Sequence, residues 1–285
     1  MTDSLPQKAL LGAPEPEKPV PAEALVTVAK TFGVSPLNQF FHQFWRILGP
    51  KKTKLFSSEY YDYQVYRPEL SKAERLEFLG RTSNRILNLS LCPPLTLIYG
   101  GVVEQKALFS VLMKGLGLPM TNLQAVVNKA QSVGEIKTLS TTEEITAFLR
   151  NEAAYPVFGK PAHGSRSIGS ALFSSLDTNA DQIILGNGQR HDVVELAEEI
   201  VSDYPSGYLF QDAVAQHEDM CAVAGKAVGT VRILTYNDGS GPKILYTLWK
   251  IPSPNAMSDN FWQNGSMVAH VAADTGVVTL SLIHI

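Results

Sequence analysis

Apolar residues recur at helical spacing in the first third of the chain, after a proline-rich start. Residues 1–21 contain five prolines among small and charged residues, a composition that predicts a disordered tail. Ser35 and Pro36 predict a helix start, because serine caps a helix N-terminus and proline fits the first turn. Gly49 would end this helix. Its apolar face consists of Leu37, Phe40, Phe41, Phe44, Ile47 and Leu48.

Two further helices are predicted before residue 120. Ser71 and Glu74 have capping-box spacing, and this helix would run to about Leu89. Gly100 precedes an amphipathic helix ending near Gly115. The stretch between the first two helices is rich in tyrosine and poor in helix formers. We expect it to be a loop whose rings pack on the helices, through Tyr60, Tyr61, Tyr63 and Tyr66.

From Ala125 onward the pattern changes to short runs of strand-forming residues. Two helices interrupt these runs, one opened by a capping box at residues 140–143 and one over 193–201. Hairpin turns are predicted at 237–241 and 274–276. The predicted fold class is therefore α+β. The expected strands cover residues 136–139, 155–160, 170–173, 182–185, 208–211, 231–235, 244–250, 266–271 and a run from 277.

Length and charge narrow the classes of function. The 285 residues suffice for about two lobes, and the net charge of −3 lacks the cation surplus that nucleic-acid binding needs. The longest apolar stretch, 87–103, is broken by prolines and glycines, so no transmembrane segment is expected. Cys92 and Cys221 have no zinc-ligand spacing; two buried thiols are favoured over one disulfide. A cytoplasmic location is the default.

The last six residues, 280–285, are unusual. They match an in-frame translation of a transposon end used in sequencing libraries, with a natural strand as the alternative. We expect that the reading frame ran off a fragment and that the natural chain continues.

The segment from Tyr155 to Phe173 carries the strongest chemical signal. A predicted strand ends at Lys160, a loop of small residues follows, and a second strand returns. Gly164 and Gly169 would let the backbone approach a ligand, and successive N–H groups of such a loop can bind an anion. A Walker-type phosphate loop does not fit, because its lysine is missing and this loop joins two strands. An ordinary glycine-rich hairpin is the alternative.

Four other segments accompany this unit in order. They are Glu104–Phe109 with Gly117-Leu118-Pro119, Gly207–Val214, Gly229–Thr235, and Lys250 followed by Asp259–Gly265. Together with the strand–lysine–glycine loop–strand unit they resemble the ATP-grasp superfamily, in its sugar-transfer-associated branch related to alpha-L-glutamate ligases. The resemblance extends from about residue 104 to 278.

The resemblance implies an ATP-grasp fold, in which two α+β lobes clamp ATP, behind a helical N-terminal region. The implied division is a tail over 1–21, helices over 22–95, an ATP-grasp domain over 96–279 and the terminal segment 280–285. It also implies two cofactors, ATP and Mg²⁺. ATP would contact Lys106, Lys160, Gly164, Ser165, Ser167, Gly169, Gln211, Asp212 and Arg232. Catalysis would involve Arg232 and Lys250, and magnesium would bind Asp259 and Asn260.

The implied activity is ATP-dependent ligation of a small carboxylate to an amine through an acyl phosphate. Association with polysaccharide-synthesis enzymes is a further implication. The alternative is a nucleotide-binding module of such a pathway without ligase activity; a sugar-handling enzyme with paired carboxylates has little support. The sequence departs from the superfamily at Gln211-Asp212, where many relatives carry glutamate, and at Asn264, which replaces a glycine. The Asp…Glu-x-Asn run that holds magnesium in the superfamily is not found in this chain.

Four of the implied site residues also have ordinary explanations. Lys106 on an amphipathic helix could simply be solvated. Arg232 in a hairpin strand could form a cross-strand ion pair. Asp259 and Asn260 could belong to a turn.

Overall fold

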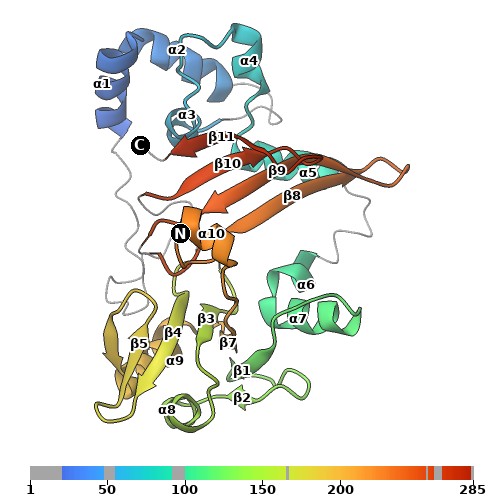
Figure 1. Cartoon of the computed structure of the whole chain (residues 1–285). Coiled ribbons are helices and arrows are strands. Elements are labelled where there is room, and N and C mark those ends of the chain that lie inside the picture. The colour runs from blue at the N-terminus through green and yellow to red at the C-terminus, as the bar shows by residue number, and fades with distance from the viewer. Residues whose placement is uncertain are drawn as a thin grey trace. The chain divides into compact units, whose positions relative to one another are not determined.

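The chain forms two compact units, one between Glu17 and Gly100 and one containing the chain from Gly101 onward. The computed structural model describes residues 21–47, 55–91, 100–164, 167–254, 256–259 and 265–283 (Figure 1). None of the helices within these ranges is both long and apolar enough to cross a lipid bilayer.

The first unit is helical and packs around aromatic side chains. Its helices are α1 (Pro21–Phe32), α2 (Pro36–Ile47), α3 (Ser57–Asp62), α4 (Lys72–Glu77) and α5 (Arg81–Leu91). The core consists of Val28, Val34, Leu55, Tyr60, Val65 and Tyr66. The predicted helix start at Ser35 and Pro36 is confirmed, and the Ser35 hydroxyl accepts a hydrogen bond from the Asn38 N–H at 3.3 Å. Residues 1–20 and Gly49 lie outside the described residues.

Two predictions for this unit were wrong in part, and Glu59 is the reason for both. Its buried carboxylate accepts from the N–H of Phe56 at 2.9 Å, which starts α3 where a loop was expected. The packing of the tyrosine rings is confirmed. The same carboxylate accepts from the Arg81 N–H at 2.7 Å and so starts a separate helix there. The single helix predicted from Ser71 is therefore two, separated by an extended Phe78.

The second unit begins with α6 (Gly100–Glu104) and α7 (Lys106–Gly115) and then builds a seven-stranded sheet. The strand order is β2-β1-β7-β3-β4-β5-β6, in which only the β1–β2 pair is parallel. The strands are β1 (Leu123–Val127), β2 (Thr138–Leu139), β3 (Val157–Pro161), β4 (Ala171–Asp177), β5 (Gln182–Leu185), β6 (Arg190–Asp192) and β7 (Tyr208–Asp212).

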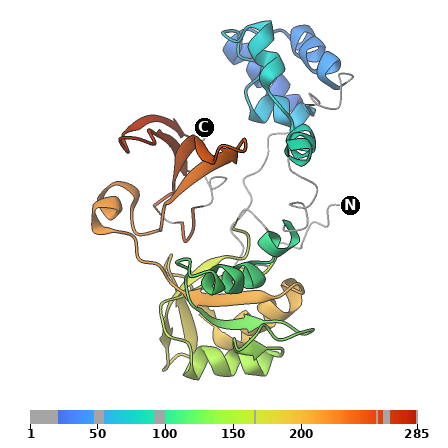
Figure 2. The ribbon, with the colours of Figure 1, turned by 90° about the vertical axis from the view of Figure 1, so that its right-hand side faces the viewer.

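Helices cover both faces of this sheet (Figure 2). Helices α8 (Thr142–Asn151) and α9 (Val193–Asp203) bury one face in the main core, which contains Phe148, Phe173 and Phe210. Helix α7 covers part of the other face, where Ala107 packs with Val126 and Leu209. The alternation of side chains along β7 explains this division, because Phe210 and Leu209 point to opposite faces.

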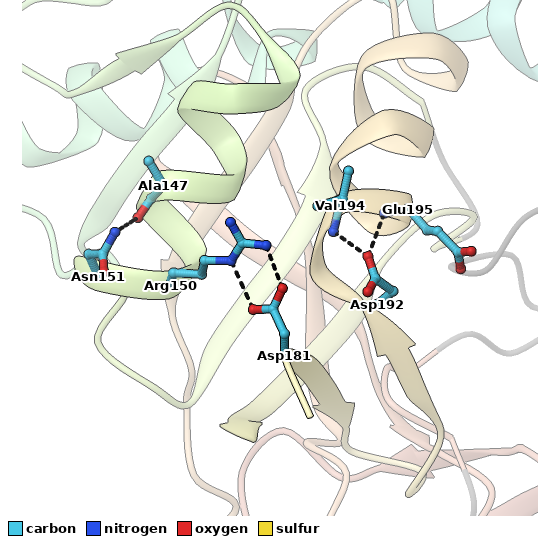
Figure 3. A network of polar contacts seen from close by, with 7 residues as sticks. All are labelled: Ala147, Arg150, Asn151, Asp181, Asp192, Val194 and Glu195. Carbon is cyan, nitrogen blue, oxygen red and sulfur yellow. Dashed lines mark hydrogen bonds and ion pairs between the residues drawn. The ribbon is translucent and has the colours of Figure 1, made fainter. Parts of the chain in front are cut away.

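Polar contacts hold α8 to the turn between β4 and β5 and cap the start of α9 (Figure 3). Arg150 at the end of α8 makes a two-point ion pair with Asp181, with its Nε donating at 2.8 Å. Asp181 has a φ of +55° and lies in that turn. Asp192 caps α9 by accepting from the N–H groups of Val194 and Glu195, at 2.8 and 3.2 Å. These contacts orient the helices on the sheet.

A second, four-stranded antiparallel sheet has the order β11-β10-β9-β8. Its strands are β8 (Thr230–Asn237), β9 (Pro242–Ile251), β10 (Met267–Val271) and β11 (Val278–Ile283), and α10 (Glu218–Ala224) precedes them. Trp249, Ile251 and Ala269 form a small core with Ala224 of α10. The terminal segment 280–283 is part of β11 and pairs with β10.

The α+β class and the predicted strands are confirmed, and so are both hairpin turns. Sequence patterns missed α1, β1, β6 and α10, and the helix predicted after Gly100 is broken at Gln105 into α6 and α7. The missed strands are short, and α10 has no apolar periodicity beyond two turns. Cys221 is a half-buried free thiol, whereas Cys92 lies outside the described residues.

Candidate functional site

Two lysines from distant parts of the sequence meet beside the end of β3. Lys160 lies on β3, paired with Leu209 of β7, and its side chain is on the sheet face that α7 covers. Lys106 is the first residue of α7. Its ammonium donates to the carbonyl oxygens of Pro161 and Gly164, at 3.1 and 3.0 Å. Lys106 therefore holds the start of the loop that follows Lys160.

The electrostatics of this pair favour an anionic ligand. Burial lowers the pKa of Lys106, and burial together with the nearby Lys106 ammonium lowers the pKa of Lys160. Neither lysine has a carboxylate partner within the described part of the chain. Both side chains are half-buried, so water compensates their charge only in part. A bound anion would relieve both the desolvation and the mutual repulsion.

The loop between β3 and β4 is anchored at its far end. The buried Tyr208 hydroxyl donates to the Gly169 carbonyl at 2.8 Å. Gly169 has a φ of +72°, and a Cβ there would lie 2.4 Å from the Tyr204 hydroxyl. Ser167 also has a positive φ, +58°, while Gly164 at +115° has open space around it. Ser165 lies outside the described residues.

Gln211 and Asp212, predicted as neighbours at the nucleotide, point to opposite faces of the sheet. Gln211 is buried and pairs with Phe158, two positions before Lys160 on β3, so it shares the lysine face. Asp212 instead accepts a hydrogen bond from Gln124 at 2.8 Å. Gln124 also donates to the Ala154 carbonyl at 3.0 Å. Asp212 is thus bound to Gln124 on the other face.

Two further predicted residues, Arg232 and Lys250, lie on the four-stranded sheet, and Asp259 contacts that sheet from the chain between β9 and β10. Lys250 on β9 forms an ion pair with Asp259 at 3.1 Å, and both side chains are largely buried. The hydroxyl of Thr230, the cross-strand partner of Lys250, donates to the same carboxylate oxygen. Arg232 is two residues further along β8, on the same face as Thr230, and is exposed. One polar cluster therefore contains Lys250, Asp259 and Thr230. The exposed guanidinium of Arg232 lies on the same strand as Thr230 and has no ion pair among the described residues.

No protein-family model matches this chain, and no curated protein is significantly similar to it. The functional argument therefore depends on the geometry of these two clusters.

The described residues do not supply a magnesium site by themselves. Across the ranges that the structure covers, no three or more histidine, cysteine, aspartate or glutamate side chains gather to hold a metal ion. Asp259 is engaged by Lys250 and Thr230, and Asn260 lies outside those ranges. Magnesium binding at these two residues stays a prediction.

Sequence reasoning did not select three residues that shape the clusters. Thr230 binds Asp259, and its position two residues before Arg232 in a strand was an available signal. Tyr204 and Tyr208 hold the loop at Gly169. No sequence signal marked these tyrosines, because their contacts with Gly169 join positions at least 35 residues apart.

Proposed function

We propose that this chain binds ATP in the manner of the ATP-grasp superfamily and acts as an ATP-dependent carboxylate–amine ligase. The pair of half-buried lysines carries the proposal. Lys106 and Lys160 lack carboxylate partners among the described residues, and their lowered pKa values reflect a charge that an anion would stabilise. The β3–β4 loop, with its anchored glycine, supports it because the backbone there can approach phosphate groups closely.

In this proposal the lysines bind phosphate oxygens. Lys160 and Lys106 contribute charge-assisted hydrogen bonds from one face of the seven-stranded sheet. Gly164, Ser165, Ser167 and Gly169 would offer backbone N–H groups to the same anion. Gln211, on the lysine face, would form hydrogen bonds with the adenine base of ATP through its side chain or its backbone. Asp212 serves as a support for β1 and β7 through Gln124.

Bound ATP would supply a phosphoryl group to a substrate carboxylate, giving an acyl phosphate from which an amine displaces phosphate. Arg232 is the group best suited to stabilise the charge that develops on the transferred phosphoryl oxygens, since its guanidinium is exposed. Lys250 would orient Asp259 through their ion pair and contribute a second positive charge. A cytoplasmic location would fit this use of ATP.

A nucleotide-binding module without ligase activity is the second candidate. The observation in its favour is that the Asp259 carboxylate already has two partners, the Lys250 ammonium and the Thr230 hydroxyl. Phosphoryl transfer needs metal ions held by oxygen ligands, and the described residues gather no such set. Either protein could associate with enzymes of polysaccharide synthesis.

Titration calorimetry with ATP and magnesium tests nucleotide binding. Lys160→Ala should weaken binding by about 1.5–3 kcal/mol, the range for a charge-assisted contact. Lys114→Ala is the matched control, because Lys114 is exposed near the end of α7 and should leave affinity unchanged. Equal affinities for the wild type and Lys160→Ala would remove Lys160 from the site.

Trapping of the acyl phosphate separates the ligase from the module. Hydroxylamine captures an acyl phosphate as a hydroxamate, so the chain is incubated with ATP, hydroxylamine and a panel of amino acids and sugar acids. A ligase yields a hydroxamate and ADP, and Arg232→Ala abolishes both while ATP still binds. ATP binding without hydroxamate for any acid in the panel would favour the module.

A further inference from the structure

The start of α7 is joined to the chain after β3 by both main chain and side chain. The Lys106 N–H donates to the Ala162 carbonyl at 3.4 Å. The Lys106 ammonium donates to the carbonyl oxygens of Pro161 and Gly164, at 3.1 and 3.0 Å. On its other side, the Ala162 N–H donates to the Gly207 carbonyl at 2.9 Å. The segment from Pro161 to Gly164 therefore lies between α7 and the residue that precedes β7.

The hydrogen bonds of the Lys106 ammonium leave few of its donors for a ligand. A lysine ammonium has three N–H donors and no acceptor, and the Pro161 and Gly164 carbonyls take two of those donors. Both acceptors are uncharged, so the positive charge of Lys106 stays without a carboxylate partner within the described residues. Lys106 can therefore give an anion one hydrogen bond while it holds the segment after β3.

Lys160 differs from Lys106 in this respect. Within the described residues its ammonium has neither a hydrogen bond nor an ion pair. Burial, and then the nearby Lys106 ammonium, lower the pKa of Lys160, so the two charges are close to one another. All three N–H donors of Lys160 are available to an anion, whereas most of those of Lys106 serve the protein.

We propose that Lys106 is a positioning residue for the anion site, which holds the segment from Pro161 to Gly164 in place beside the Lys160 ammonium before an anion binds. The inference rests on the proposed function, in which the anion is the triphosphate of ATP. Lys160 then supplies the main contact to that anion. The contribution of Lys106 is preorganisation, because a segment that is already ordered costs less entropy when the ligand arrives.

Hydrogen exchange in the nucleotide-free full chain tests this role. Lys106→Met keeps the apolar stem of the side chain and removes the ammonium, so the bonds to Pro161 and Gly164 cannot form. The amide of Ala162 should then exchange at least about tenfold faster, since a hydrogen bond from a charged donor is lost. Lys106→Arg should restore slow exchange, because a guanidinium also donates to carbonyl oxygens. Lys114→Met, at an exposed position of α7, is the control and should exchange like the wild type.

Titration calorimetry with ATP and magnesium measures the consequence for binding. Lys106→Met should weaken binding at least about tenfold, and Lys106→Arg should recover most of that loss. Weaker binding by Lys106→Met with the wild-type exchange rate would make Lys106 a direct ligand only and overturn the proposal. Faster exchange without any loss of affinity would overturn it as well, because the position of the segment would then not matter for binding.

The proposed function and this inference can fail separately. If the wild type binds no ATP, the ligase and the module both fail, and the same comparison with inorganic tripolyphosphate decides the role of Lys106. Binding of neither anion would overturn the positioning role too. Thermal unfolding verifies that the variants are folded. Lys106→Gln, which keeps a neutral amide donor, gives the same comparison should Lys106→Met not fold.

Discussion

At the scale of single residues, Lys160 occupies a position that is unfavourable for a cation in the free chain. Its side chain is half-buried and lies near the ammonium of Lys106. Both factors lower its pKa below the ordinary value of 10.5. A group that costs stability unless a ligand binds is typical of a functional site. The lowered pKa of Lys160 also predicts how the free energy of unfolding depends on pH.

Lys160→Met should stabilise the free chain by about 1 kcal/mol near neutral pH, because it removes a poorly solvated charge. In the wild type, the folded state releases the Lys160 proton at a lower pH than the unfolded state does. Wild-type stability therefore rises between the lowered pKa and 10.5, so the advantage of the variant shrinks there. Urea unfolding at neutral pH and near pH 10 measures both differences.

Lys114→Met is the control for this experiment and should change stability by less than about 0.5 kcal/mol at either pH. A destabilised Lys160→Met at neutral pH would mean that the ammonium has a stabilising partner in the folded chain.

At the scale of elements, the β3–β4 hairpin is held at one end and open at the other. At Gly169 the backbone has a positive φ, the Tyr204 ring packs against it, and the Tyr208 hydroxyl donates to its carbonyl. At Gly164 the φ is also positive, but nothing lies within 4 Å of where a Cβ would be. The two glycines therefore separate the cost of a strained backbone from the cost of crowding.

Gly169→Ala should lower the free energy of unfolding by about 2–4 kcal/mol, since backbone strain adds to overpacking against Tyr204. Gly164→Ala should cost only about 1 kcal/mol, from strain alone. Thermal and urea unfolding of both variants give the comparison. Similar losses for the two would show that the Tyr204 contact does not constrain the hairpin.

At the scale of the whole molecule, the chain divides into two units with separate cores. In the helical unit, the buried carboxylate of Glu59 starts two helices by binding the N–H groups of Phe56 and Arg81. Its side chain is 2% exposed, and Arg81 also pairs with it at 3.4 Å. The stability of this unit should depend on Glu59 while that of the other unit should not.

Glu59→Ala should destabilise the helical unit by about 2–4 kcal/mol, because the part-buried N–H groups that start two helices lose their acceptor. Differential scanning calorimetry should show one transition shifted to lower temperature and the transition of the sheet-containing unit unchanged. Glu74→Ala, which removes the exposed partner of the α4 capping box, is the control and should cost about 1 kcal/mol or less. If both transitions moved together in Glu59→Ala, the units would not unfold separately.

Local signals in the sequence determined most of the elements and their kinds. Ser35-Pro36 and the two hairpin turns act within a few residues, so they could be located without knowledge of the fold. The capping sequence before α8 was located to within one residue, because the N-cap is Thr141, which accepts from the Glu144 N–H, and not Ser140. The Lys160 loop could be selected for the same reason. The breaks before Lys106 and Arg81 could not, because the Ala162 carbonyl and the Glu59 carboxylate that bind these residues' N–H groups lie far away in sequence.

Tertiary structure alone decided which predicted residues meet. Strand β7 lies between β1 and β3, and this non-local pairing puts Gln211 on the face of Lys160 and Asp212 on the other. Lys106 reaches the loop after Lys160 across more than fifty residues of sequence. Hydrophobic periodicity predicted an apolar face on α2 but not its direction, and the hydrogen bonds of buried Gln39 decided that Leu37, Phe40 and Phe41 lie exposed. Burial of a polar group requires every partner in place, and those partners come from segments that only the fold brings together.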